Sequence, residues 1–235
     1  MINPIGNRPY LAGIVILAGG ASSRMGTPKA QLLLPTGESL LDYHVRQAAE
    51  LNVPIMVADN ERGFQVSADL LLKHENLPIL YIPDYGSKLN AENSDKQKAT
   101  GGALVAIASA LQTMSTQTNT RILVNKQDAW LMVMSCDSLV PAMQLWQKLQ
   151  SSMTQSIHSS VVCLTDDTHL YPLLGLYRLS LELDLVDYLD RGERQVMKFI
   201  QHQVQPIALP KNWQHLTNFN TPEQFKQACA ALNDL

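Results

Sequence analysis

The sequence predicts an α/β fold in which a doubly wound, mostly parallel sheet carries helices on both faces. Short apolar segments rich in β-branched residues alternate with segments whose apolar residues recur at helical spacing. Residues 130–135 are expected to form the central strand, because their apolar run is unbroken up to Ser135. No Pro/Gly/Ser-rich linker and no internal repeat interrupts the 235 residues, so we expect a single domain, 1–235.

The first half of the chain is expected to contain three strands, at residues 13–18, 54–58 and 80–82. Ser39-Leu-Leu-Asp42 resembles a capping box with Asp in place of Glu, and it predicts the start of a helix. A second helix is expected to begin at Gly101, where apolar residues recur every three or four positions. The remaining expectations are a loose leader at 1–10 and polar loop excursions at 85–100 and 115–128.

The second half is expected to continue the alternation of helices and strands. Helices are predicted from Pro141 onward, at 180–190 and at 193–201, and strands at 160–164, 173–177 and 204–209. Gly192 is expected to end the helix 180–190 as its C′ residue. The start of the last helix is marked by Thr221 as N-cap, Pro222 at N1 and Gln224 at N3.

Composition and charge exclude several classes of protein. The formal net charge of −3 argues against a nucleic-acid-binding protein, so any phosphate site must be a local concentration of cations. Three cysteines without paired spacing favour a reducing compartment. No apolar run approaches the roughly 18 residues that a membrane-spanning helix needs. We therefore expect a cytoplasmic protein with no nucleic-acid and no membrane partner.

A glycine-rich loop follows the first predicted strand and contains two cations. From Leu17 to Lys29 it reads Leu-Ala-Gly-Gly-Ala-Ser-Ser-Arg-Met-Gly-Thr-Pro-Lys. Glycines let the backbone approach a ligand, unpaired amides point at an anion, and Arg24 and Lys29 neutralise it. The spacing is neither that of the P-loop nor Gly-x-Gly-x-x-Gly. We expect a phosphate site here, with a tight packing turn as the alternative.

This loop matches a known nucleotidyltransferase signature in full, and through it the chain resembles the molybdenum cofactor guanylyltransferases, a MobA-like family. Further segments match that family in its own order. They are Asp84 at a strand end, Gly101-Gly-Ala-Leu104, Met134-Ser-Cys-Asp137, Leu189–Val196 and Asn218-Phe-Asn-Thr-Pro-Glu223. The resemblance implies a Rossmann-like nucleotidyltransferase fold.

The resemblance also implies roles for individual residues. The implied nucleotide-binding residues are Leu17, Ala18, Gly19, Gly20, Lys29, Asn60, Asp84 and Asp137, with the amides of Ala18 to Gly20 holding the nucleotide. The implied catalytic residues are Arg24, Lys29 and Asp137, and Asp137 would also hold Mg²⁺, the one expected cofactor. The implied acceptor-binding residues are Arg191, Gly192, Glu193, Arg194, Asn218 and Asn220.

The chain departs from the family at several positions, and two of these departures, Ala58 and the segment 85–100, concern base selectivity. Ala58 stands where the family usually has a nucleotide-contacting asparagine, and Asn60 is the candidate substitute. Gly102 and Val105 replace a proline and a glycine at the start of the family's helix. The polar segment 85–100 is longer than the family normally carries.

The implied function is transfer of GMP from GTP to a molybdopterin-type cofactor with release of pyrophosphate. GTP and molybdopterin would be the substrates, and proteins that deliver or accept the cofactor would be transient partners. Three alternatives remain: a CTP-dependent cytidylyltransferase on the same pterin, a sugar-phosphate nucleotidyltransferase, and a non-catalytic nucleotide- or cofactor-binding protein.

Each implied site residue also has a structural alternative. Asp137 could cap the helix that follows it. Gly192-Glu-Arg194 could be a helix stop with solvated charges, and Asn218 and Asn220 are ordinary turn formers.

Overall fold

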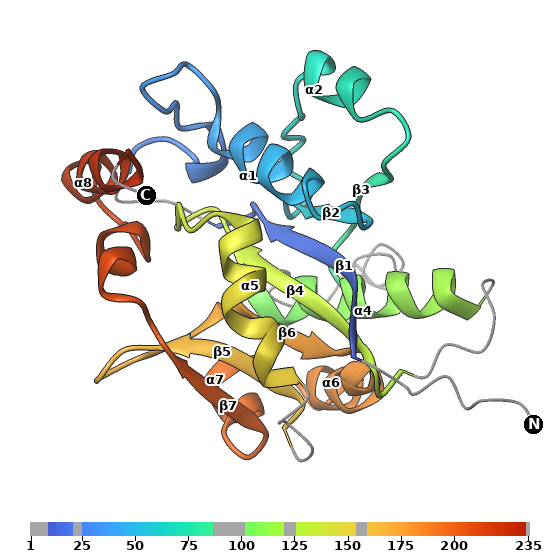
Figure 1. Cartoon of the computed structure of the whole chain (residues 1–235). Helices are drawn as coiled ribbons and strands as arrows, with labels where there is room; N and C mark the ends of the chain where they lie inside the picture. The colour runs from blue at the N-terminus through green and yellow to red at the C-terminus, as the bar shows by residue number, and fades with distance from the viewer. Residues whose placement is uncertain (1–8, 21–24, 87–101, 120–125, 154–158, 234–235) are drawn as a thin grey trace, which may run out of the picture.

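The computed structural model describes residues 9–20, 25–86, 102–119, 126–153 and 159–233, whose seven strands join one sheet (Figure 1). The strands are β1 (Tyr10–Leu17), β2 (Ile55–Ala58), β3 (Ile79–Tyr81), β4 (Ala129–Ser135), β5 (Val161–Thr165), β6 (Leu170–Arg178) and β7 (Val204–Ala208). Their order is β3-β2-β1-β4-β6-β5-β7. β6 runs antiparallel to both neighbours, and the other pairings are parallel, so the predicted mostly parallel sheet is confirmed.

β4 lies at the middle of the sheet, as predicted, and all of its residues are buried. Val133 of β4 pairs with Val15 of β1 on one side and with Gly175 of β6 on the other. A Cβ atom at Gly175 would lie 2.6 Å from the carbonyl oxygen of Val162, so glycine permits the close approach of β5 and β6.

Helices cover both faces of the sheet (Figure 1). One face packs against α1 (Leu40–Ala49), α2 (Ala68–Lys73), α5 (Ala142–Met153) and α8 (Pro222–Leu232). The other face packs against α4 (Ala103–Asn119), α6 (Glu182–Asp190) and α7 (Val196–Ile200). Short 3₁₀ helices are η1 (Lys29–Gln31), η2 (Leu179–Leu181) and η3 (Lys211–Leu216). Two apolar cores therefore flank the sheet, which confirms the doubly wound arrangement.

Local capping signals placed two helix starts and one helix end correctly. Ser39 Oγ accepts a hydrogen bond from the Asp42 amide at 3.1 Å and caps α1. Thr221 Oγ1 accepts from the amide of Gln224 at 3.3 Å and caps α8. Gly192 follows α6 with φ +85°, the left-handed conformation expected of a C′ glycine.

The predicted helix 193–201 is shorter than expected. α7 begins only at Val196, because its N-cap Gln195 is extended, with φ −83° and ψ 112°. Tyr188 of α6 donates a hydrogen bond to the carbonyl oxygen of Gln195 at 3.1 Å. This bond stabilises the extended residue and leaves Glu193 and Arg194 in the turn between the two helices.

The predicted polar loop 115–128 is wrong over its first five residues, because α4 continues to Asn119. Hydroxyl groups inside the helix bond their own backbone: Thr113 Oγ1 donates to Ser109 O at 2.8 Å, and Thr116 Oγ1 donates to Gln112 O at 2.9 Å. Hydroxyls bonded in this way are accommodated within the helix and do not divert the backbone into a turn. Residues 120–125, most of the predicted loop 85–100 and residues 1–8 of the predicted leader lie outside the described residues.

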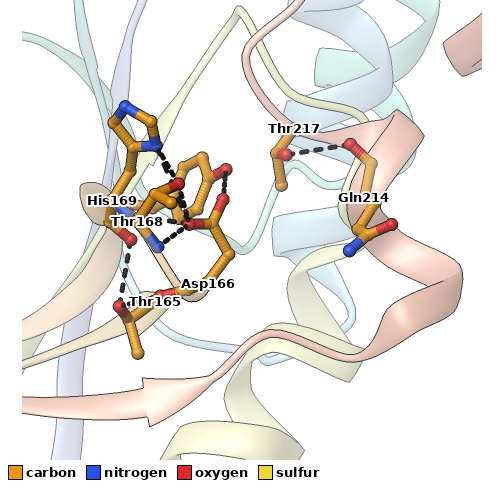
Figure 2. Close-up of polar contacts among 7 residues, drawn as sticks. Thr165, Asp166, Thr168, His169, Gln214 and Thr217 are labelled. Atoms are coloured by element: carbon orange, nitrogen blue, oxygen red, sulfur yellow. Dashed lines mark hydrogen bonds and ion pairs between the residues drawn. The ribbon is translucent and has the colours of Figure 1, made fainter.

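The turn between β5 and β6 is closed by one carboxylate (Figure 2). Asp166 Oδ1 accepts from the amides of Thr168 and His169, both at 2.7 Å, and Asp166 Oδ2 accepts from the Tyr171 hydroxyl at 2.5 Å. The Tyr171 hydrogen bond is the main reason that the pKa of Asp166 lies well below its ordinary value. Thr217, directly after η3, donates from its Oγ1 to the Gln214 carbonyl oxygen at 3.2 Å (Figure 2).

All described strands lie in one sheet, and the single domain 1–235 stays a prediction. Within the described chain, no helix has both the length and the apolar composition needed to cross a bilayer.

His44 lies on the core face of α1, packed edge-on against the Tyr43 ring with centroids 5.3 Å apart. Its side chain is fully buried. Burial lowers the pKa of His44 to about 4, so the native state holds a neutral imidazole at physiological pH.

We expect this histidine to make the protein less stable as the pH falls from about 6.5 to about 4. In that window the unfolded chain binds a proton that the native state does not, so the free energy of unfolding decreases by at most about 3 kcal/mol. Urea unfolding at pH 7 and pH 5 should show a larger loss for the wild type than for His44→Leu. Equal losses in both proteins would contradict the prediction.

Candidate active site

A cavity of about 340 Å³ opens where β1, β2 and β4 end. The carboxyl edge of a parallel sheet is where α/β proteins bind ligands, and this volume suits a small molecule. The wall is formed by Leu17, Ala18, Gly19, Gly20, Met25, Lys29, Ala58, Asn60, Asp84, Gly102, Ala103, Ala106, Ser135, Cys136, Asp137, Leu173 and Asn220. The structure therefore brings together the described nucleotide-binding residues predicted from the sequence.

The glycine-rich loop leaves β1 between β2 and β4. The Ala18 amide donates to the carbonyl oxygen of Ala58 at 2.8 Å, and Leu17 O accepts from the Cys136 amide at 3.2 Å. The expectation that the Ala18 amide holds the nucleotide is therefore wrong, because that amide extends the sheet. Gly19 and Gly20 line the cavity, whereas Arg24 lies outside the described residues.

Gly19 lies against the turn that carries Asn60. A Cβ atom at Gly19 would lie 2.7 Å from Asn60 Cβ and 3.0 Å from the Asp59 carbonyl carbon. Asn60 and Glu61 both have left-handed backbones, with φ +56° and +58°. The buried Asp59 carboxylate stabilises this turn by accepting from the amides of Glu61 at 3.0 Å and Phe64 at 2.9 Å. Asn60 thereby reaches the cavity from a position two residues beyond Ala58.

Lys29 joins three segments that are far apart in the sequence. Its Nζ donates to Asn220 Oδ1 at 2.8 Å and lies 3.7 Å from Asp137 Oδ2. The same Nζ lies 5.7 Å from the centroid of the Phe219 ring. The Lys29 side chain is 13% exposed and the Asp137 side chain 29% exposed, so both can contact a ligand in the cavity.

Asp137 does not cap the helix that follows it. α5 begins at Ala142, five residues further on, and Ser138 Oγ accepts the Val140 amide in the connection at 3.1 Å. The backbone of Asp137 is instead held by the C-terminal segment, because its carbonyl oxygen accepts from the Phe219 amide at 2.9 Å. The carboxylate remains part of the cavity wall.

Asp84 forms the opposite part of the wall, beyond the end of β3. It is only 5% exposed, and its Oδ2 atom has no hydrogen-bond partner among the described residues. Burial, followed by the nearby carboxylates of Glu61 and Asp59, raises the pKa of Asp84 above its ordinary value. A buried, unpaired acceptor of this kind fits a ligand that donates hydrogen bonds.

The structure separates the predicted acceptor-binding residues into two groups. Asn220 lines the cavity, and its Nδ2 donates to Asn218 Oδ1 at 3.0 Å, but Asn218 itself is exposed outside the wall. Residues 191–194 also lie outside the described wall. Arg194 Nη1 donates to the carbonyl oxygen of Leu189 at 2.6 Å, so this arginine caps α6.

The turn 191–194 is nevertheless connected to the cavity edge. Tyr85 follows Asp84 in the sequence, and its hydroxyl donates to Asp190 Oδ1 at 3.0 Å. Glu193 is paired with Lys198 at 2.6 Å, whereas the Arg191 side chain is exposed.

Several residues of the cavity wall were not predicted from the sequence. Leu173 reaches the cavity from β6, and Ala103 and Ala106 reach it from the first turns of α4. All three are apolar and carry no local signal of a site. Burial raises the pKa of Cys136 to about 12, which fits a thiol that packs as a small apolar side chain. Among the described residues, no group of three His, Cys, Asp or Glu side chains could hold a metal ion.

The sequence model of the MobA-like NTP transferase domain matches residues 14–206. The chain belongs to this family. The predicted family resemblance and the predicted class of enzyme, a nucleotidyltransferase, are thereby confirmed. The chain is 26% identical over 223 residues to the molybdenum cofactor guanylyltransferases of Yersinia pestis (strain Pestoides F) and Yersinia pseudotuberculosis serotype IB, covering 92% of this chain and 93% of each relative.

Solved structures share the fold. Molybdopterin-guanine dinucleotide biosynthesis protein A from Archaeoglobus fulgidus superposes with a TM-score of 0.64 at 16% identity, over 95% of this chain and 100% of that one. The 2-C-methyl-D-erythritol 4-phosphate cytidylyltransferase of Francisella tularensis gives a TM-score of 0.57 at 15% identity, over 93% and 98% of the two chains. The Rossmann-like nucleotidyltransferase fold is therefore confirmed.

The contact between Gly19 and Asn60 leads to a prediction about nucleotide binding. In Gly19→Ala, the added methyl group meets backbone and Cβ atoms that cannot swing away, so we expect the KM for the nucleoside triphosphate to rise about tenfold. The measurements are the KM and a thermal unfolding curve for each protein. A KM within about twofold of the wild type would contradict the prediction.

Proposed function

We propose that this chain transfers GMP from GTP to a molybdopterin-type cofactor and releases pyrophosphate. One observation carries the proposal: Lys29, Asp137 and Asn220 converge on a nucleotide-sized cavity beside the glycine-rich loop of a MobA-like NTP transferase. The names of the Yersinia relatives support guanylyl transfer in particular.

The order of the strands supports a proposed region of the cavity for each part of the nucleotide. The nucleoside lies on the side of β2 and β3, against Asn60 and Asp84, and the phosphates lie over the loop that follows β1. The α-phosphate and the acceptor meet on the β4 side, near Asp137 and Asn220. This arrangement keeps the acidic pair Asp59 and Asp84 away from the triphosphate.

The reaction is an in-line displacement. A phosphate oxygen of molybdopterin attacks the α-phosphorus of GTP, a new P–O bond forms, and the bond to the leaving pyrophosphate breaks. Lys29 stabilises the negative charge that develops on pyrophosphate, with Arg24 as the second expected cation. The attacking group is already an anion, so no strong base is needed, and no histidine lies in the described cavity wall.

Mg²⁺ is the proposed cofactor, with Asp137 as its protein ligand. The residues present fit this ion, since Asp137 offers carboxylate oxygens to the cavity and is not closed off by the 3.7 Å approach of Lys29 Nζ. Mg²⁺ commonly binds through one or two carboxylates together with substrate phosphates and water. When bound, it would neutralise phosphate charge during the displacement.

For the acceptor, we propose Asn220 on the cavity side and the turn Arg191–Arg194, with Gly192 and Glu193, at its outer edge. Asn218 would act through Asn220 rather than by direct contact. The exposed Arg191 is the side chain of this turn best placed to receive a phosphate. We also propose that the chain contacts, transiently, the proteins that deliver or accept the cofactor, and that it is located in the cytoplasm.

The proposal is tested by pyrophosphate release from the purified chain with Mg²⁺, molybdopterin and one nucleoside triphosphate at a time. We expect release with GTP, and none when molybdopterin is replaced by sugar phosphates. Release with CTP alone would make the chain a cytidylyltransferase. Binding of GTP without release would make it a non-catalytic binding protein.

Replacing Asp137 tests the metal site. Asp137→Asn preserves shape but removes the charge that attracts a hard cation, so we expect Mg²⁺-dependent turnover to disappear with an unchanged melting temperature. The measurements are a Mg²⁺ titration of pyrophosphate release and a thermal unfolding curve for each protein. Retained activity with a lowered melting temperature would show that Asp137 is structural.

The unpaired oxygen of Asp84 predicts how guanine is selected. Guanine presents two adjacent donors, N1–H and the 2-amino group, whereas the hypoxanthine of ITP lacks the amino group. The wild type should prefer GTP to ITP by about tenfold, the order expected of a hydrogen bond to a charged group. Asp84→Asn should remove most of this preference. A variant that keeps it, but loses discrimination between GTP and 2′-deoxy-GTP, would place Asp84 at the ribose.

A further inference from the structure

The Lys29 ammonium group is held by the side-chain amide of Asn220, and only one orientation of that amide satisfies its hydrogen bonds. Lys29 can only donate hydrogen bonds, and the two Asn218 oxygens can only accept them. Asn220 satisfies both because Oδ1 accepts from Lys29 at 2.8 Å while Nδ2 donates to Asn218 O at 3.2 Å and Oδ1 at 3.0 Å. The position of Lys29 Nζ therefore depends on where Asn220 is held.

Asn220 is held in turn by the first turn of α8. Its backbone amide donates to Gln224 Oε1 at 2.8 Å. Gln224 belongs to a helix whose Ala228 and Cys229 are buried in the core, so this hydrogen bond ties an otherwise exposed turn to a rigid element. Asn218 within that turn has a left-handed backbone, with φ +51°, which asparagine tolerates better than most residues.

We infer that Gln224 is a positioning residue for the reaction, acting on Lys29 through Asn220. The inference rests on the role proposed above for Lys29. Gln224 itself is exposed and lies outside the cavity wall, so it contacts neither substrate nor the reacting atoms. Its loss should leave the nucleotide pocket intact and misplace the cation that stabilises pyrophosphate.

The test compares two substitutions at this position by pyrophosphate release from GTP and molybdopterin. Gln224→Leu removes the acceptor oxygen of this hydrogen bond. At saturating molybdopterin it should lower kcat about tenfold with the KM for GTP within about twofold, because transition-state stabilisation is lost and nucleotide binding is not. Gln224→Glu keeps an oxygen acceptor and should retain kcat within about twofold. Wild-type kcat in Gln224→Leu would overturn the inference.

Two matched controls separate positioning from stability. Gln227 is an exposed glutamine of the same helix with no side-chain hydrogen bond among the described residues, so Gln227→Leu should leave kcat unchanged. Thr221→Ala removes the N-cap of α8 without touching the bond between Gln224 and Asn220. It should lower the melting temperature and keep kcat. A tenfold loss of kcat in Thr221→Ala would mean that helix stability alone explains the effect, and would overturn the inference.

A double substitution distinguishes this inference from the proposed function itself. Lys29→Ala should lower turnover about 100-fold, and adding Gln224→Leu should change it by less than about twofold, because the residue to be positioned is gone. A further tenfold loss in the Lys29→Ala background would show that Gln224 does not act through Lys29. Wild-type turnover in Lys29→Ala would instead refute the role proposed for Lys29, and the inference with it.

Discussion

The hydrogen bond between Lys29 Nζ and Asn220 Oδ1 is the contact on which the rest of the site depends. The chain carries a formal net charge of −3, so it has no general attraction for a triphosphate and must place cations individually. One ammonium group is fixed between the Asn220 amide and the Asp137 carboxylate, and an aromatic ring lies beneath it. The glycine-rich loop, the end of β4 and the C-terminal segment become one site through this contact.

The cavity has a different electrostatic character at its two ends. On the β4 side, Lys29 and Asp137 suit phosphates and a hard cation. On the β2 and β3 side, the buried Asp84 and the neighbouring carboxylates of Asp59 and Glu61 suit a neutral group rich in hydrogen-bond donors. A nucleoside triphosphate has the same asymmetry, and this match supports the orientation proposed above.

Features encoded by neighbouring residues could be predicted from the sequence. The apolar run of β4, the Ser39 and Thr221 caps and the Gly192 helix end each depend on a few adjacent positions. The polar end of α4 could not be predicted, because Thr113 and Thr116 bond to their own helix backbone instead of favouring a loop.

Individual residues of the site could be predicted from the sequence, but the hydrogen bonds between them could not. Family signatures indicated Lys29 and Asn220 separately, and nothing local shows that two residues 191 positions apart share a hydrogen bond. The same limit applies to Ala18, whose amide is used by the partner strand β2, and to Arg194, which the structure uses to cap α6. Which acceptor a donor such as the Ala18 amide or the Arg194 guanidinium bonds to depends on all the acceptors that the folded chain brings near it.

The 191-residue separation between Lys29 and Asn220 also bears on how the enzyme becomes active during folding. Contacts between distant parts of a chain close large loops, and their entropic cost delays them relative to local structure. The pairing of β1 with β2 and the start of α1 need only the first part of the chain. A chain that had formed only these elements would already hold Gly19 beside Asn60, yet Lys29 would lack its hydrogen bond to Asn220. Nucleotide binding would therefore precede catalytic competence, and turnover would report the last long-range contact to form.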